Sequence, residues 1–192
     1  MNSEPAKGLV PNSPLSRAEN FRSRLLIGTT VILFSNLIFA GADLLLSGGT
    51  SLPVWACKGV QVIEILWVRY RLHRGARMPE MNFLGVLMVS TVIAMTSLSG
   101  YFSNEKETTQ ILSIAILFAS AGIVPWPRGS QMIIALVAVG SIWALQMVLG
   151  ESATYGILAV GSGAACSVLM ADLLARRRVL VEKSEKVAHQ RE

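Results

Sequence analysis

The sequence predicts an all-α membrane protein: a six-helix transmembrane bundle with both termini in the cytoplasm and a cytoplasmic helical extension of the last span. Of the 192 residues, 52% are hydrophobic and only 15% are charged, whereas about a quarter of an average soluble domain is charged. The mean hydropathy is +0.52. The apolar residues form six blocks of roughly 20, which is the helix length that crosses a hydrocarbon core.

Each apolar block is a continuous run without alternation of apolar and polar residues. Transmembrane β-strands would alternate with a period of two, so the runs favour helices. The connections between the blocks are too short to fold into a separate ligand-binding domain, and any ligand is therefore expected within the bilayer or in a shallow cleft. The predicted spans are residues 25–46, 52–68, 81–101, 108–124, 130–149 and 152–174.

The distribution of basic residues sets the predicted orientation. Short cytoplasmic loops of membrane proteins are enriched in Lys and Arg, and 15 of the 17 basic residues lie on one side of the predicted spans. Lys106 lies on the other side and Lys58 within the second span. Both termini are therefore predicted to be cytoplasmic, in the inner membrane of a bacterial cell. The net charge of +5 follows from this topology and is no indication of nucleic-acid binding.

The chain is predicted to have three segments. Residues 1–24 contain three prolines and no apolar run, so they are expected to form a disordered cytoplasmic arm and not a signal peptide. Residues 25–174 form the six-span bundle, and residues 175–192, termed the exit helix, form a cytoplasmic signalling helix.

Polar residues in the first two spans form a candidate ligand-binding or intramembrane polar site: Asp43, Lys58, Gln61 and Glu64. The last three are spaced by three residues, so they make a polar ridge along one helix. An Asp43–Lys58 ion pair and a ligand-binding role are both open. A charged carboxylate inside a bilayer costs a few kcal/mol, so Glu64 is expected to pair with Arg69, to join two helices, or to contact a ligand or relay protons.

Small residues recur at every fourth position of the last span: Ala159, Gly163, Ser167, Ala171 and Ala175. Such a stripe allows a second helix to approach closely. Packing inside the bundle and packing across a dimer interface both fit this pattern.

A heptad pattern continues beyond the last span. Leu173, Leu180 and Val187 recur at intervals of seven with charged residues between them, which predicts the seam of a parallel coiled coil. A basic amphipathic tail lying on anionic lipid is the alternative.

The proline-rich turn and the cysteines are expected to have structural roles only. The Pro-Trp-Pro-Arg-Gly sequence at residues 125–129 is expected to form a tight turn, with Trp126 as an anchor at the membrane interface. Two Cys and two His are too few for an ordinary zinc cluster, so no metal or cofactor is expected, and Cys166 is interpreted as a small buried residue.

The arrangement resembles the N-terminal membrane input module of bacterial receptor enzymes, the sensor histidine kinases and class III nucleotide cyclases. The resemblance lies in the basic entry and closing Asp of residues 22–43, in Lys58, in the SAGIVPWPRGSQ stretch that ends at Gln131, and in ADLLARRRVLVEKSEKVAHQRE at residues 171–192. It implies a homodimer that signals through the exit helix to a cytoplasmic output domain.

The sequence thus predicts a sensory or regulatory module in contact with membrane lipid. It is not expected to be an enzyme by itself, because it has no phospho-acceptor His in a kinase context, no ATP-binding Gly-rich box and no metal-binding Asp pair. The output domain is expected to be missing from this chain or to belong to a partner protein. A self-contained accessory or scaffold subunit of a membrane complex is the alternative, and a small transporter using Glu64 is the third hypothesis.

Overall fold

The computed structural model describes residues 14–46, 51–103, 105–149 and 154–189, with side chains over 17–41, 51–103, 105, 107–148, 156–181 and 184. These residues form helices and no strand, which confirms the all-α class. The helices are α1 (Pro14–Leu46), α2 (Leu52–His73), α3 (Met78–Ser103), α4 (Lys106–Ile123), α5 (Arg128–Leu149) and α6 (Thr154–His189).

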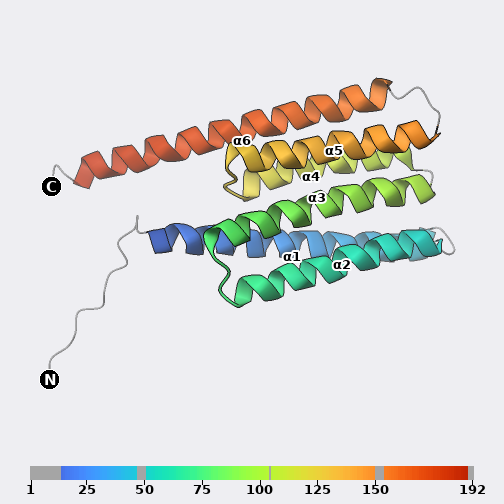
Figure 1. The fold of residues 1–192 in the computed structure, drawn as a ribbon, viewed down its shortest axis with the longest axis horizontal. Coiled ribbons are helices and arrows are strands. Elements are labelled where there is room, and N and C mark those ends of the chain that lie inside the picture. Colours follow the sequence, from blue (N-terminus) through green and yellow to red (C-terminus); the bar gives the residue numbers. More distant parts are fainter. Residues whose placement is uncertain (1–13, 47–50, 104, 150–153, 190–192) are drawn as a thin grey trace.

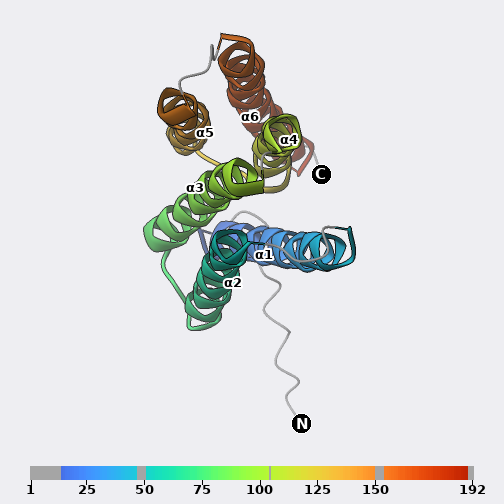
Figure 2. The same cartoon turned by 90° about the vertical axis from the view of Figure 1, so that its right-hand side faces the viewer.

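Helix α3 holds the bundle together. It packs against α1 and α2 on one side and against α4 and α5 on the other, and α6 covers α4 and α5. The start of α1 and the end of α6 lie at the same end of the bundle, and α6 extends beyond the other helices there (Figure 1). Figure 2 shows the two groups of helices on either side of α3.

Four helices are long and apolar enough to cross a membrane: Arg17–Gly41 in α1, Met78–Ser103 in α3, Arg128–Val148 in α5 and Gly156–Val181 in α6. These correspond to the first, third, fifth and sixth predicted spans. Helix α4 is a shorter apolar helix over Glu107–Ile123. Helix α2 carries four charged residues among its 22, namely Lys58, Glu64, Arg69 and Arg71. The structure therefore supports a membrane protein with four clear spanning helices.

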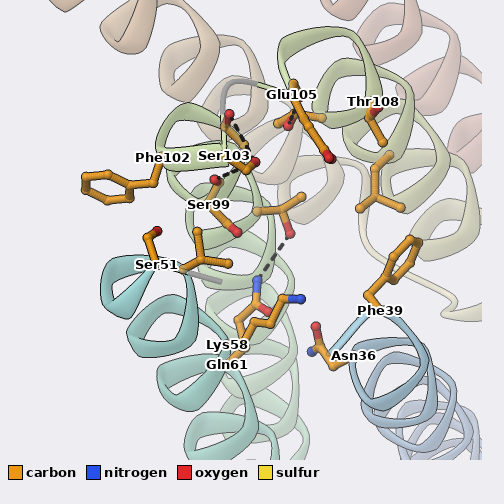
Figure 3. Close-up of a pocket in the computed structure, with 15 residues that line it drawn as sticks. Asn36, Phe39, Ser51, Lys58, Gln61, Ser99, Phe102, Ser103, Glu105 and Thr108 are labelled. Atoms are coloured by element: carbon orange, nitrogen blue, oxygen red, sulfur yellow. Dashed lines mark hydrogen bonds between the residues drawn. The ribbon is translucent and has the colours of Figure 1, made fainter. Parts of the chain in front are cut away.

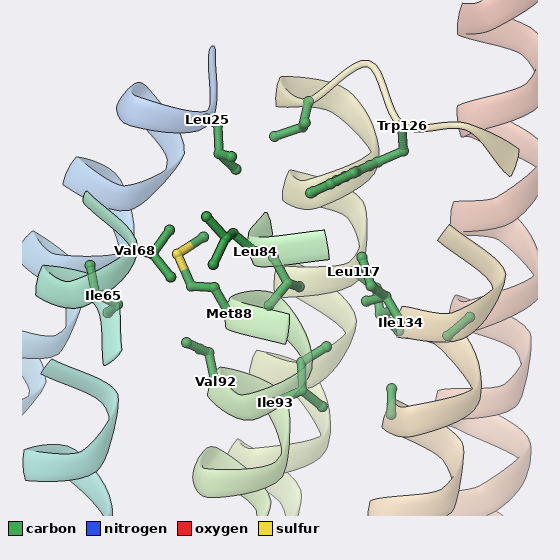
Figure 4. Packing of buried hydrophobic residues seen from close by; sticks show 14 of the residues in the cluster. Leu25, Ile65, Val68, Leu84, Met88, Val92, Ile93, Leu117, Trp126 and Ile134 are labelled. Carbon is green, nitrogen blue, oxygen red and sulfur yellow. The ribbon is translucent and has the colours of Figure 1, made fainter. Parts of the chain in front are cut away.

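The interior and the surface have the polarity expected of a protein in lipid. The core formed around α3 is apolar, with fully buried Ile65, Ile93 and Leu117 (Figure 4). The outer surface is apolar as well: in α1, Phe34 is 65% and Leu37 is 59% exposed. Several polar side chains are buried instead: Thr29, Gln61, Ser97, Thr109, Ser113, Ser120, Ser130, Gln131 and Ser167.

One helix boundary differs from expectation, and the expected helical extension of the last span is present. Helix α1 begins at Pro14, so residues 14–24, predicted to be disordered, are helical. A proline is tolerated in the first turn of a helix, where its missing N–H has no helical partner. Helix α6 runs without a break from Thr154 to His189 and so includes most of the exit helix. Residues 1–13 and 190–192 lie outside the described residues.

Candidate functional site

The polar ridge of α2 divides between two environments. Gln61 is buried against α3, where its Nε2 donates hydrogen bonds to the Val92 carbonyl oxygen at 3.0 Å and to Thr96 Oγ1 at 3.1 Å. Lys58, one turn before it, lines a cavity with Asn36 of α1 (Figure 3). The Lys58 Nζ also lies 6.0 Å from the centre of the Trp55 ring.

Glu64 has a different neighbour from the one expected. Its side chain lies within hydrogen-bonding reach of Thr91 in α3, and its buried Oε2 has no hydrogen-bond partner. Arg69, the predicted partner, donates from Nη1 to Thr30 Oγ1 of α1 at 2.7 Å. Among the alternatives for Glu64, this geometry favours a contact between helices and contradicts pairing with Arg69.

Asp43 cannot be placed in the same way. It belongs to α1, but its side chain lies outside the described residues. The Asp43–Lys58 ion pair therefore stays a prediction.

The cavity at Lys58 has a volume of about 300 Å³ and opens between α1, α2, α3 and the start of α4. We term it the polar cavity, because amide, hydroxyl and charged side chains line much of it (Figure 3). Asn36 Nδ2 is buried there without a hydrogen-bond partner, and such an unsatisfied donor carries a desolvation cost that a ligand could relieve. Glu64 does not line this cavity.

A second cavity of about 210 Å³ lies deeper between α1, α3 and α4. We term it the apolar cavity, because Leu25, Met88, Ile116 and other apolar side chains dominate its wall. The two cavities share four wall residues, Asn36, Phe39, Thr96 and Leu112. Together they form one amphipathic cleft, with a hydrogen-bonding end that carries both Lys58 and Glu105 and with an apolar end.

The small-residue stripe of α6 packs inside the bundle. A side chain added at Gly163 would lie 3.0 Å from Ile114 of α4. Ser167 and Ala171 are buried, Ala159 is half-buried, and Ala175 is exposed. The stripe therefore brings α6 close to α4, and α4 lies between the cleft and α6.

The predicted coiled-coil seam is uncovered in the single chain. Leu173 and Leu180 are each 66% exposed, and the side chain of Val187 lies outside the described residues. Cys166 is also exposed, contrary to its interpretation as a buried residue, because it lies on the face of α6 that no other helix covers.

One predicted position was wrong, that of Trp126, and one buried residue, Gln131, was not predicted. Trp126, expected at the membrane interface, is 3% exposed; its Nε1 donates to the Ser120 carbonyl oxygen at 2.8 Å, because the proline-rich turn folds it back over the end of the bundle. Gln131 is fully buried, and its Nε2 is 3.3 Å from Ser120 Oγ of α4 and from Ser167 Oγ of α6. Gln131 directly follows Arg128, Gly129 and Ser130, so its position resembled the end of a polar turn and gave no signal that it would be buried.

No family model, curated protein or solved structure matches this chain. Within the part of the chain that the structure describes, no group of three or more His, Cys, Asp and Glu side chains could hold a metal ion. The function must therefore be argued from the cleft and the helices around it.

Proposed function

We propose that this protein is a sensory or regulatory module of a bacterial inner membrane that binds an amphiphilic ligand and passes a signal out along α6. The observation that carries the proposal is the amphipathic cleft, in which Lys58 and Asn36 stand at one end and apolar residues of α1, α3 and α4 at the other. In this proposal the helices α2 and α4 also cross the membrane, both termini are cytoplasmic, and the protein is a homodimer.

The chemistry of the cleft defines the class of ligand. The Lys58 ammonium favours an anionic or strongly hydrogen-bonding headgroup, and the unsatisfied Asn36 Nδ2 is a donor for an acceptor on the same group. The apolar cavity favours an alkyl chain or a hydrophobic ring, since burial of apolar surface stabilises the complex. A medium-chain carboxylate is the simplest molecule with both features.

Helix α4 is the proposed route from the cleft to α6. Its residues Ala115 and Ala119 line the apolar cavity, and its residue Ile114 packs on Gly163 of α6. A ligand that displaces α4 would therefore act directly on the helix that leaves the bundle. The exposed Leu173 and Leu180 would then form the dimer seam that leads to a histidine kinase or nucleotide cyclase output domain, in this polypeptide or in a partner.

Binding to the cleft can be tested with a fluorescent medium-chain fatty acid and the full chain in phosphatidylcholine nanodiscs. Ala115→Phe fills the apolar cavity, and Ala144→Phe places the same ring on an exposed position of α5 as the matched control. We expect Ala115→Phe and Lys58→Gln to weaken binding about tenfold, equivalent to about 1.4 kcal/mol, and Ala144→Phe to leave it unchanged. Equal affinity of all four proteins would contradict the cleft as the binding site.

Transmission can be tested by disulfide crosslinking of single cysteines placed one at a time along residues 173–189, including residues 173, 180 and 187, with Cys57 and Cys166 replaced. A parallel dimer predicts crosslinking that is maximal at these positions and weak at the intervening ones, and it predicts a change when the fatty acid is added. Uniformly absent crosslinking would instead support a monomeric accessory subunit of a membrane complex.

A further inference from the structure

A groove rich in arginine lies at the opposite end of α1 from the polar cavity. It has a volume of about 840 Å³ and runs between the start of α1, the end of α6 and the turn after α4. Both helices contribute arginines to its wall: Arg17 and Arg24 from α1, and Arg177 and Arg178 from α6. We term it the arginine groove. Figure 1 shows the start of α1 and the extended part of α6 at the same end of the bundle, with the α4–α5 turn between them.

The described residues that line the arginine groove include arginines but no acidic residue. Arg24 and Arg178 face this wall from different helices. The nearby carboxylate of Asp172 binds Arg176 at 2.8 Å, and Arg176 does not line the groove. A site that gathers like charges in this way is stabilised by a bound anion.

The groove is also built to hold its shape. The Arg24 Nε donates to Asn20 Oδ1 at 3.0 Å, which fixes the plane of the guanidinium group. Phe21 beneath it is buried and makes an edge-on contact with Trp126, with ring centres 5.8 Å apart. Planar guanidinium groups bind phosphate oxygens in pairs, which adds geometric specificity to the charge.

Apolar side chains lie directly beside the arginines. Met78, Leu174 and Val181 line the same groove, and the apolar stretches of α1 and α6 begin and end here, at Arg17 and Val181. A soluble phosphate compound would leave these side chains in water, whereas a phospholipid would cover them with its acyl chains. The combination favours a lipid.

We propose that the arginine groove binds the phosphate headgroup of an anionic phospholipid, which joins α1 to α6 where α6 leaves the bundle. The lipid supplies negative charge to the described wall, which contains no acidic residue, and bridges the start of the exit helix to α1. This site is separate from the amphipathic cleft, so the failure of either proposal leaves the other standing.

The test is the binding of phosphatidylglycerol with a fluorescent acyl chain to the full chain in dodecyl maltoside micelles. The groove variant is the double mutant Arg24→Gln/Arg178→Gln. The matched control is Arg22→Gln/Arg176→Gln, which removes the same charge from the same two helices two residues away, outside the groove wall. We expect the groove variant to lose at least tenfold in affinity and the control less than twofold, because only the groove variant removes charge-assisted hydrogen bonds to the phosphate.

Three results would overturn the proposal. Equal losses in the two double mutants would show a general effect of charge. Equal affinity of wild-type protein for the phosphatidylcholine analogue would show that the anionic headgroup is not recognised. Displacement of the lipid probe by inorganic pyrophosphate at a similar concentration would assign the groove to a soluble phosphate compound. If the groove double mutant does not fold, the single variant Arg177→Gln, at an exposed position, replaces it in the binding measurement. This variant is expected to bind the lipid more weakly than wild type.

Discussion

Helix α1 is packed less closely at Gly28 than α3, α4 and α6 are at Gly100 and Gly163, although Gly140 in α5 and Gly161 in α6 also have open space. A side chain added at Gly100 in α3 would overlap the Thr109 side chain of α4, and one added at Gly163 in α6 would lie 3.0 Å from Ile114. In contrast, side chains added at Gly28 in α1 or at Gly59 in α2 would meet nothing within 4 Å. The backbones of α3, α4 and α6 are therefore close together, while α1 leaves open space beside α3.

Buried side-chain hydrogen bonds join α2 to α3 through Gln61 and join α4, α5 and α6 to one another. Gln131 joins α4, α5 and α6 through Ser120 and Ser167, and all three residues are buried. The hydrogen bond between Arg69 and Thr30, which joins α2 to α1, lies at an exposed position. Buried hydrogen-bonded networks fix one arrangement of helices more strongly than exposed contacts do. The α3–α6 part is thus a framework, and α1 is the wall against which a ligand can bind with little repacking.

The largest expected effect comes from Trp126→Ala, which removes the residue that closes one end of the framework. Truncation of a buried Trp leaves a cavity and should lower the free energy of unfolding by about 3–5 kcal/mol. Trp143→Ala, at a position 51% exposed in α5, should change it far less. Denaturant titration in micelles, followed by circular dichroism, measures both, and equal losses would mean that Trp126 is not part of the core.

An intermediate effect is expected from Gly100→Ala. The new methyl group would overlap the Thr109 side chain, and the short, branched threonine cannot move aside, so α3 and α4 must separate. Overpacking of this kind costs about 1–3 kcal/mol. The same titration measures it. Gly140→Ala in α5, where no atom lies within 4 Å of the added group, is the control and should not be destabilised.

The smallest effect is expected from Gly28→Ala in α1, which lies outside the α3–α6 framework. Its added methyl group has open space, and alanine is favoured over glycine inside a helix by roughly 0.5–1 kcal/mol. The variant should therefore be as stable as wild type or slightly more stable in the same titration. A loss like that of Gly100→Ala would show that α1 is packed as tightly as the framework.

Much of the fold follows from the sequence because it depends on local composition. The long apolar runs predict helices, and four of the six predicted spans coincide with helices that are long and apolar enough to cross a membrane. The small-residue stripe around Gly163 and the polar ridge at Lys58 and Gln61 were visible as spacings alone. The residues that each of them contacts could not be predicted from these spacings.

The amino-acid sequence was sufficient to predict the all-α class, the membrane character and the polar residues within the apolar helices. These features depend on whether each segment is stable in lipid or in water, which its composition sets. Other features required the three-dimensional structure: the α6 stripe packs on α4, and Trp126 turns inward. The structure also brings Arg69 to Thr30, and Arg24 to the same groove as Arg178. These contacts join residues far apart in the chain. Their geometry depends on how the helices cross, which no local pattern of residues specifies.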